Sequence, residues 1–195
     1  MPKFSDREKE RIYDKLREEG EQLFVQHGLR KVTVDELSRA TGIAKGTFYH
    51  FYESKEHLFM DISVKIQFKL WERMNVVLEE SKGMPPKELT RKIFMTMATF
   101  SAEYPLVNMM DQDTIEQLMR KLPPDIVEKH VQEDSDFLQK IEEYGVRFKI
   151  DRNLAAKVLE HVYMSSINMN FETPETRTEI LMLLLNGAID QIVED

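Results

Sequence analysis

Apolar residues recur every three or four positions along most of this 195-residue chain, which is the period of an amphipathic α-helix. Alternating runs of β-branched residues and Asn-Gly turns, which would indicate strands and hairpins, are not visible in the sequence. Capping residues, glycines and prolines divide the apolar pattern into segments. We expect helices over residues 5–26, 33–41, 44–52, 54–80, 86–103, 123–144, 151–171 and from 173 onward, with one or two short helices within 106–122. The pattern therefore predicts an all-α fold.

The segment from Thr33 to Leu58, TVDELSRATGIAKGTFYHFYESKEHL, carries the most specific local signals. Thr33 and Glu36 have the S/T-x-x-E spacing of a capping box, as Ser5 and Glu8 do at the start of the first helix. Gly42 then supplies the left-handed residue that a tight connection between two crossing helices needs. Two short helices joined in this way are typical of a helix-turn-helix, whose second helix enters the major groove of DNA.

The second of these helices has two chemically different faces at about 100° per residue. One face is apolar and is expected to pack inward; it holds Ala44, Phe48, Phe51 and Tyr52. The other face is expected to point outward; it holds Lys45, Gly46, Tyr49 and His50, with Thr47 at the border. An amine, a phenol, an imidazole and a hydroxyl suit phosphate oxygens and base edges. An ordinary solvated helix face is the alternative, which the glycine and the aromatic residues disfavour.

The same segment resembles the DNA-binding domain of the tetracycline-repressor (TetR) family, with its pattern T-v-d-e-l-a-x-x-a-G-x-s-k-g-t-x-Y-x-x-F-x-s-K-e-x-L. The matching positions are Thr33, Val34, Leu37, Ala40, Gly42, Lys45, Gly46, Thr47, Tyr49, Ser54, Lys55, Glu56 and Leu58. Three positions depart from the pattern. Ala44 stands where the family often has Ser, Phe51 where it often has Tyr or His, and Tyr52 where it usually has Phe. Phe51 cannot donate to a phosphate, so that contact is not carried over.

The resemblance implies an N-terminal three-helix helix-turn-helix domain, residues 1–53, and a larger helical ligand-binding and dimerisation domain, residues 54–195. It implies a homodimer that represses by occupying pseudopalindromic double-stranded operator DNA, and that a small apolar or aromatic effector releases. Release would come from a changed separation of the two recognition helices, transmitted through the long helix that begins at Ser54.

We expect seven residues to contact DNA. Thr33, Lys45, Tyr49 and Lys55 are assigned to phosphates, and Thr47 and His50 to bases. Gly46 would let the backbone approach the duplex closely.

The last two predicted helices are expected to form the dimer interface. Residues Ile180 to Leu185 are apolar without interruption, so their helix has a second apolar face to bury. The expected interface residues are Val158, Val162, Ser165, Leu181, Leu184, Leu185, Ala188 and Ile189. The alternative is a helix that is simply central in its own domain.

Twelve Met residues, many of them interleaved with aromatic residues in the middle of the chain, suggest an adaptable apolar pocket. The expected ligand-binding residues are Trp71, Met74, Phe94, Met97, Phe100, Tyr104, Met110, Phe137, Tyr163 and Asn168. The polar tips of Trp71, Tyr104, Tyr163 and Asn168 would orient the ligand. Residue by residue, ordinary core packing is the stronger alternative.

The net charge of −8 lies outside the N-terminal part. Residues 1–60 hold eleven Lys or Arg and eleven Asp or Glu, so the excess acid belongs to the remainder of the chain. That distribution would favour one docking orientation on DNA and mildly favours neutral or cationic ligands. The sequence has no Cys, no secretory signal and no apolar run of the roughly 20 residues that span a bilayer. We therefore expect a cytoplasmic protein without a membrane partner.

Catalysis is the competing functional class, and the sequence gives it little support. The five His residues do not form an H-E-x-x-H motif, and neither a Gly-rich phosphate loop nor a nucleophile elbow is visible. We expect no catalytic residue, no metal and no cofactor. Two hypotheses besides a ligand-released repressor stay open: a DNA-binding regulator whose C-terminal domain binds a protein partner, and an interaction module that does not bind DNA.

Overall fold

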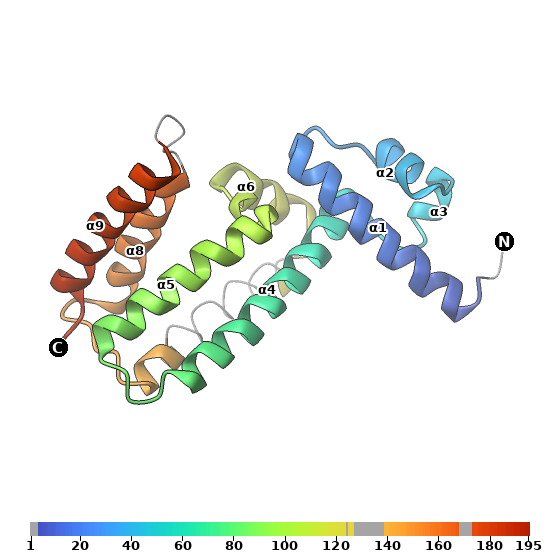
Figure 1. Ribbon diagram of the computed structural model, residues 1–195. Coiled ribbons are helices and arrows are strands. Elements are labelled where there is room, and N and C mark those ends of the chain that lie inside the picture. The colour runs from blue at the N-terminus through green and yellow to red at the C-terminus, as the bar shows by residue number, and fades with distance from the viewer. Residues whose placement is uncertain (1–3, 124, 127–138, 168–172) are drawn as a thin grey trace. The chain divides into compact units, whose positions relative to one another are not determined.

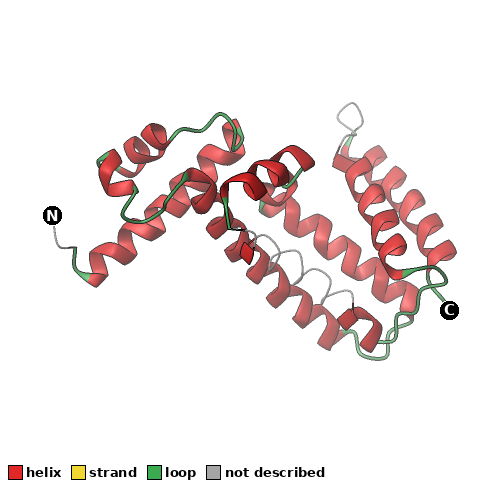
Figure 2. Cartoon of the chain, turned by 180° about the vertical axis from the view of Figure 1, so that it is seen from behind, coloured by secondary structure: helices red, strands yellow, loops and turns green. Residues whose placement is uncertain are grey.

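A computed structural model describes residues 4–123, 125–126, 139–167 and 173–195 (Figure 1). Its elements are α1 (Asp6–His27), α2 (Val34–Thr41), α3 (Lys45–Phe48), α4 (Lys55–Glu80), α5 (Pro86–Glu103), η1 (Pro105–Met109), α6 (Gln112–Lys121), α8 (Arg152–Ile167) and α9 (Pro174–Ile192). Over the residues that are described, Figure 2 shows helices and loops only. The predicted all-α fold is confirmed.

The capping residues act as the sequence predicts. The side chains of Ser5 and Thr33 accept from the backbone N–H three residues later, and Glu8 and Glu36 reach back to the cap backbone, so both capping boxes are complete. Gly42 ends α2 in the left-handed conformation, with φ +76° and ψ 30°. A side chain at this φ would strain the turn between α2 and α3.

Helices α6 and α8 also begin next to capping side chains. Asp111 accepts from the N–H of Thr114 at 2.8 Å and opens α6, so the region 106–122 holds one 3₁₀ helix and one α-helix. Asp151 accepts from two backbone N–H groups at the start of α8. Most of the helix expected over 123–144 lies outside the described residues. One feature was not expected: an isolated antiparallel bridge joins Phe148 and Val193.

The chain divides into two compact units. Unit 1 comprises Met1–Lys69 and Ser101–His130, and unit 2 comprises Leu70–Phe100 and Val131–Asp195. Helices α4 and α5 each contribute residues to both units. The domain boundary expected between residues 53 and 54 stays a prediction.

The core of unit 1 joins α1, α2, α3 and the first part of α4. Phe24 and Phe59 are fully buried and meet edge to face, with ring centroids 5.2 Å apart. At Gly20, a Cβ atom would lie 3.0 Å from Leu58, so glycine permits the close approach of α1 and α4.

In unit 2, α8 and α9 lie side by side (Figures 1 and 2). Leu181, Leu185 and Ile189, spaced four residues apart on one face of α9, are buried there. Within the described part of the chain, none of the helices is long and apolar enough to cross a membrane.

Candidate functional site

The recognition segment, residues 44–52, contains a shorter helix than the sequence predicts. Helix α3 covers only Lys45–Phe48, and the next residues form turns in which Phe51 and Tyr52 donate to the carbonyl of Phe48. Ala44 is the N-cap and gives no side-chain hydrogen bond, as expected from its departure from the family pattern. The inward position predicted for Ala44 is wrong: it has extended backbone and is exposed, because the helix begins one residue later.

The rest of the segment has the predicted two faces. Phe48 and Tyr52 are buried and Phe51 is half-buried. Lys45, Gly46, Tyr49 and His50 are exposed, and Thr47 is intermediate. Half of the Tyr49 surface is exposed (51%), although one ring edge contacts Phe48. A Cβ atom at Gly46 would meet nothing within 4 Å, so this backbone is open to a large partner.

The amine of Lys45 lies 2.7 Å from a carboxylate oxygen of Asp35, the second residue of α2. Both side chains are more than half exposed. The hydrogen bond with Asp35 raises the pKa of Lys45 above its ordinary value. The Lys45 amine is therefore a positive charge positioned by Asp35, and a phosphate can replace this exposed carboxylate as its partner.

Lys55 has a structural role that sequence reasoning missed. Its amine donates to the backbone carbonyls of Val32 at 2.7 Å and Arg30 at 3.1 Å. The first residue of α4 is thereby tied to the loop between α1 and α2. No local signal predicts this contact, because 23 residues separate Lys55 from Val32. Its contact with a phosphate stays a prediction.

Thr33 uses its hydroxyl within its own capping box. The hydroxyl donates to Glu36 at 2.7 Å and accepts from the Glu36 N–H at 3.2 Å. The side-chain hydrogen bond, and then the backbone one, lower the pKa of Glu36. A phosphate at Thr33 would have to compete with this carboxylate, and the contact stays a prediction.

A polar cluster behind the recognition segment was also missed. Asp61 of α4 accepts on one oxygen from the Tyr52 hydroxyl at 2.5 Å and from Nε of Arg17 at 2.6 Å. The ring of Tyr13 packs edge-on against both Phe51 and Tyr52. Side chains of α1 and α4 therefore fix the end of the recognition segment.

The expected ligand-binding residues that the structure describes divide between the two units, and their role stays a prediction. Met74, Phe94 and Phe100 are buried, Trp71 and Tyr163 are half-buried and Met97 is exposed, all in unit 2. Tyr104 and Met110 belong to unit 1. Phe137 and Asn168 lie outside the described residues. Phe94 and Tyr163 do contact each other, with ring centroids 6.3 Å apart.

Unit 2 also has an open pocket that none of the described residues among them lines. Its volume is about 390 Å³, and its lining residues are Arg73, Val77, Lys92, Met95, Thr96 and Thr99. Met74, Phe94 and Phe100 are buried in the core, which was the stronger alternative for single residues.

The expected dimer residues divide into two groups. Leu181, Leu185 and Ile189 are buried within unit 2, so they are core residues of the single chain; their assignment to an interface surface is corrected. Leu184 is 44% exposed, while Val158, Val162, Ser165 and Ala188 are half-buried. Further exposed apolar residues of α8 and α9 are Leu154, Met164 and Leu183.

Comparison with known proteins identifies the N-terminal region. Residues 16–62 match the model of the family described as bacterial regulatory proteins, tetR family. This match covers the buried half of α1, the whole helix-turn-helix and the start of α4.

The N-terminal region of this chain is therefore similar to the regulatory proteins of the tetR family. An HTH-type transcriptional regulator of Bacillus subtilis (strain 168), YerO, is 33% identical over 70 residues, which are 36% of this chain and 24% of that protein. The chain thus spans about a quarter of the length of that curated relative.

Solved structures extend the likeness to the whole fold. The ketosteroid transcriptional regulator KstR2 of Mycobacterium tuberculosis aligns with a TM-score of 0.68 at 18% identity, over 99% of this chain and 98% of its own. PfmR of Thermus thermophilus aligns at 0.67 and 23% identity, over 91% and 98%. The fatty acid degradation regulator FadR of Bacillus halodurans aligns at 0.59 and 16%, over 94% and 96%. The names of these matched proteins describe regulators.

No group of three or more His, Cys, Asp or Glu residues in the described part of the chain could hold a metal ion.

Proposed function

We propose that this protein is a cytoplasmic transcriptional regulator of the TetR family that binds a pseudopalindromic operator in double-stranded DNA as a homodimer. In this proposal it represses transcription, and a small effector with an apolar or aromatic body releases it from DNA. The observation that carries the proposal is an exposed set on a segment anchored by buried aromatic rings: Lys45, Gly46, Tyr49 and His50, with the half-buried Thr47 beside them.

The exposed set has the chemistry that a DNA groove requires. Lys45 supplies a held positive charge, and the Tyr49 hydroxyl supplies a neutral donor for phosphates. His50 and Thr47 supply short polar groups that can read base edges. The open backbone at Gly46 removes the side chain that would hold the duplex away. Because the segment is fixed by Phe48 and Tyr52 from behind, little conformational entropy is lost when it docks.

A symmetric dimer would place two such segments in successive major grooves, about 34 Å apart. Support for the dimer comes from apolar side chains that α8 and α9 leave exposed. Leu183 is 74% exposed and Leu184 44%, and Leu154 and Met164 are exposed on α8. A two-fold interface uses the same patch on both copies, so these two helices would meet their own counterparts.

Support for an effector comes from the pocket in unit 2 and from the relatives. The regulators that share the fold include one named a ketosteroid transcriptional regulator and one named a fatty acid degradation regulator. Steroids and fatty acids both have a large apolar body. An effector bound in unit 2 would act through α4, which runs from the helix-turn-helix into that unit.

The test begins with selection of bound fragments from a genomic library, followed by titration of one selected fragment by fluorescence anisotropy. Lys45→Ala and Tyr49→Phe should weaken binding, whereas Lys157→Ala, which removes an exposed cation from α8, should leave it unchanged. Failure to select any fragment at low salt would favour a protein-interaction module. Binding that no small molecule weakens would favour a protein partner for the C-terminal domain.

A further inference from the structure

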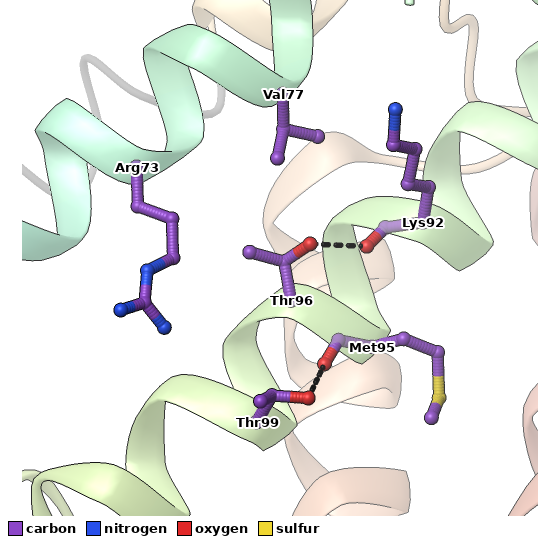
Figure 3. A pocket seen from close by; sticks show the side chains of 6 residues that line it. All are labelled: Arg73, Val77, Lys92, Met95, Thr96 and Thr99. Carbon is purple, nitrogen blue, oxygen red and sulfur yellow. Dashed lines mark hydrogen bonds between the residues drawn. The ribbon is translucent and has the colours of Figure 1, made fainter.

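The pocket in unit 2 is built by one face of each of two helices (Figure 3). Arg73 and Val77 come from α4, spaced four residues apart. The remaining lining residues, Lys92, Met95, Thr96 and Thr99, come from α5 and share one face of that helix. Their spacing of three and four residues makes the pocket a property of the helix surfaces rather than of a loop.

The charge of this lining is positive. Arg73 and Lys92 are cations, and no Asp or Glu is among the described residues that line the pocket. The hydroxyls of Thr96 and Thr99 donate to carbonyls of their own helix at 2.8 and 2.9 Å. Electrostatic attraction for a ligand therefore comes from the two cations, and the threonines add methyl groups and acceptor oxygens.

Arg73 is the better anchor of the two cations. Its guanidinium carbon lies 5.0 Å from the centroid of the buried Phe100 ring, which holds the planar group in place. Lys92 donates to the hydroxyl of Ser81 at 2.9 Å. Figure 3 shows the Lys92 amine and the Arg73 guanidinium at opposite ends of the pocket. Val77 and Met95 add apolar surface to the lining.

We propose that this pocket binds a small organic anion: an oxyanion group such as a carboxylate or sulfonate, held by Arg73, on an apolar body that covers Val77 and Met95. This inference rests on the proposed function, because it names the chemical class of the effector. It reverses the preference for neutral or cationic ligands that the net charge suggested. The charge of the whole chain is screened over about 8–10 Å in salt, so the cations at the pocket decide the local potential.

The experiment uses two dyes that differ only in one sulfonate group, and therefore in charge. 1-Anilinonaphthalene-8-sulfonate and N-phenyl-1-naphthylamine share one aromatic body, and only the first carries a sulfonate. Their dissociation constants are measured by fluorescence titration on the full-length protein and on Arg73→Gln, Arg73→Lys and Lys92→Met. Lys157→Met, which removes an exposed cation from α8, is the matched control. Circular dichroism melting verifies that each variant is folded.

The expected result is selective for the sulfonate. Arg73→Gln should weaken the anionic dye about tenfold or more, since a charge-assisted hydrogen bond is lost, and should leave the neutral dye unchanged. Arg73→Lys should retain part of the affinity, and Lys92→Met should cost less than Arg73→Gln. Equal weakening of both dyes, or no weakening of either, would overturn the assignment of an anion site.

A separate measurement distinguishes this inference from the proposed function. The anionic dye is added to the complex of the protein with its selected DNA fragment. Arg73-dependent dye binding that leaves DNA affinity unchanged would support the anion site and count against effector release. Release of DNA by the neutral dye alone, in wild type and Arg73→Gln alike, would support release and overturn the anion site.

Discussion

The Tyr52 hydroxyl donates to Asp61 at 2.5 Å, and this hydrogen bond joins the end of the recognition segment to α4. The same carboxylate oxygen accepts from Arg17 of α1 at 2.6 Å. Tyr52 is 4% exposed, so its hydroxyl has little access to water. A buried donor with one charged acceptor stabilises one orientation of the segment, because other orientations would leave the hydroxyl unpaired.

Tyr52→Phe should therefore destabilise the protein at neutral pH. Loss of a hydrogen bond to a charged acceptor should reduce the free energy of unfolding by about 1.5–2 kcal/mol. Asp61 keeps its contact with Arg17, so the variant should still fold. Urea unfolding followed by circular dichroism measures the change. Tyr49→Phe is the control, because that exposed hydroxyl should be worth less than about 0.5 kcal/mol; equal losses in both variants would contradict the role of the Asp61 contact.

The same pair predicts a pH dependence. Burial, and next the hydrogen bond with Asp61, raise the pKa of Tyr52 above its ordinary value. In the unfolded chain this tyrosine ionises near pH 10, so above that pH the unfolded state binds fewer protons and stability falls. The difference in free energy of unfolding between wild type and Tyr52→Phe should be fully present below about pH 10. It should be about 1.4 kcal/mol smaller at pH 11. Urea unfolding of both proteins from pH 8 to 11 measures the gap, and a constant gap would count against a raised pKa in the folded protein.

Gly20 and Gly46 should respond in opposite directions to the same substitution. A Cβ at Gly20 meets Leu58 at 3.0 Å and Ile62 at 3.3 Å inside the core. Overpacking costs about 1–3 kcal/mol and exceeds the gain of about 1 kcal/mol in helix propensity, so Gly20→Ala should lower the free energy of unfolding.

Gly46→Ala meets nothing within 4 Å and should raise the free energy of unfolding by up to about 1 kcal/mol. In the proposed function it should also weaken DNA binding, because its methyl group would face the duplex. Urea unfolding and anisotropy on a selected DNA fragment measure the two effects. Unchanged DNA affinity in Gly46→Ala would remove the close backbone approach from the proposal.

Sequence patterns correctly predicted those features of the site that depend only on residues close together in the chain. The capping box of Thr33 and Glu36, the left-handed Gly42 and the buried Phe48 and Tyr52 all depend on spacings of a few residues. The Arg17–Asp61 contact spans 44 residues, and no periodicity shows which charged residues of two helices will meet. Lys55 shows the same limit, since its family position does not reveal that its amine holds the preceding loop.

Amino-acid composition was a weaker guide to the pocket than helical periodicity was to the helices. Methionine and aromatic residues fill cores and line pockets equally well, so Met74 and Phe100 could be named but not placed. The pocket that exists is lined mainly by residues of ordinary helix surfaces, such as Thr96 and Thr99. In α9, the uninterrupted apolar run from Ile180 to Leu185 indicated two apolar faces. It could not indicate which of them faces the protein's own core.

Lys45 and Lys55 should have separable effects. Lys45→Ala removes an exposed cation, so the slope of log K against log salt concentration should fall by about 0.9 in magnitude, with stability unchanged. Lys55→Ala leaves two carbonyls without their donor and should reduce the free energy of unfolding by about 1–2 kcal/mol. Anisotropy at several salt concentrations, with urea unfolding of each variant, measures both. If Lys55→Ala lowers the magnitude of the salt slope by about 0.9 and leaves the free energy of unfolding unchanged, Lys55 is a phosphate contact alone.

Two leucines two positions apart on α9 should separate assembly from folding. Leu183 is 74% exposed, whereas Leu185 is fully buried. In the proposed dimer, Leu183→Glu would place an unpaired charge in the interface and should give a folded monomer with much weaker DNA affinity. Leu185→Ala would instead leave a cavity in the core and should lower the free energy of unfolding by about 2–5 kcal/mol, whether or not the protein dimerises. Sedimentation equilibrium at micromolar concentration measures assembly, and urea unfolding measures stability. A Leu183→Glu protein that remains dimeric would move the interface to another surface, because a charge buried between two apolar helices could not be tolerated there without loss of association.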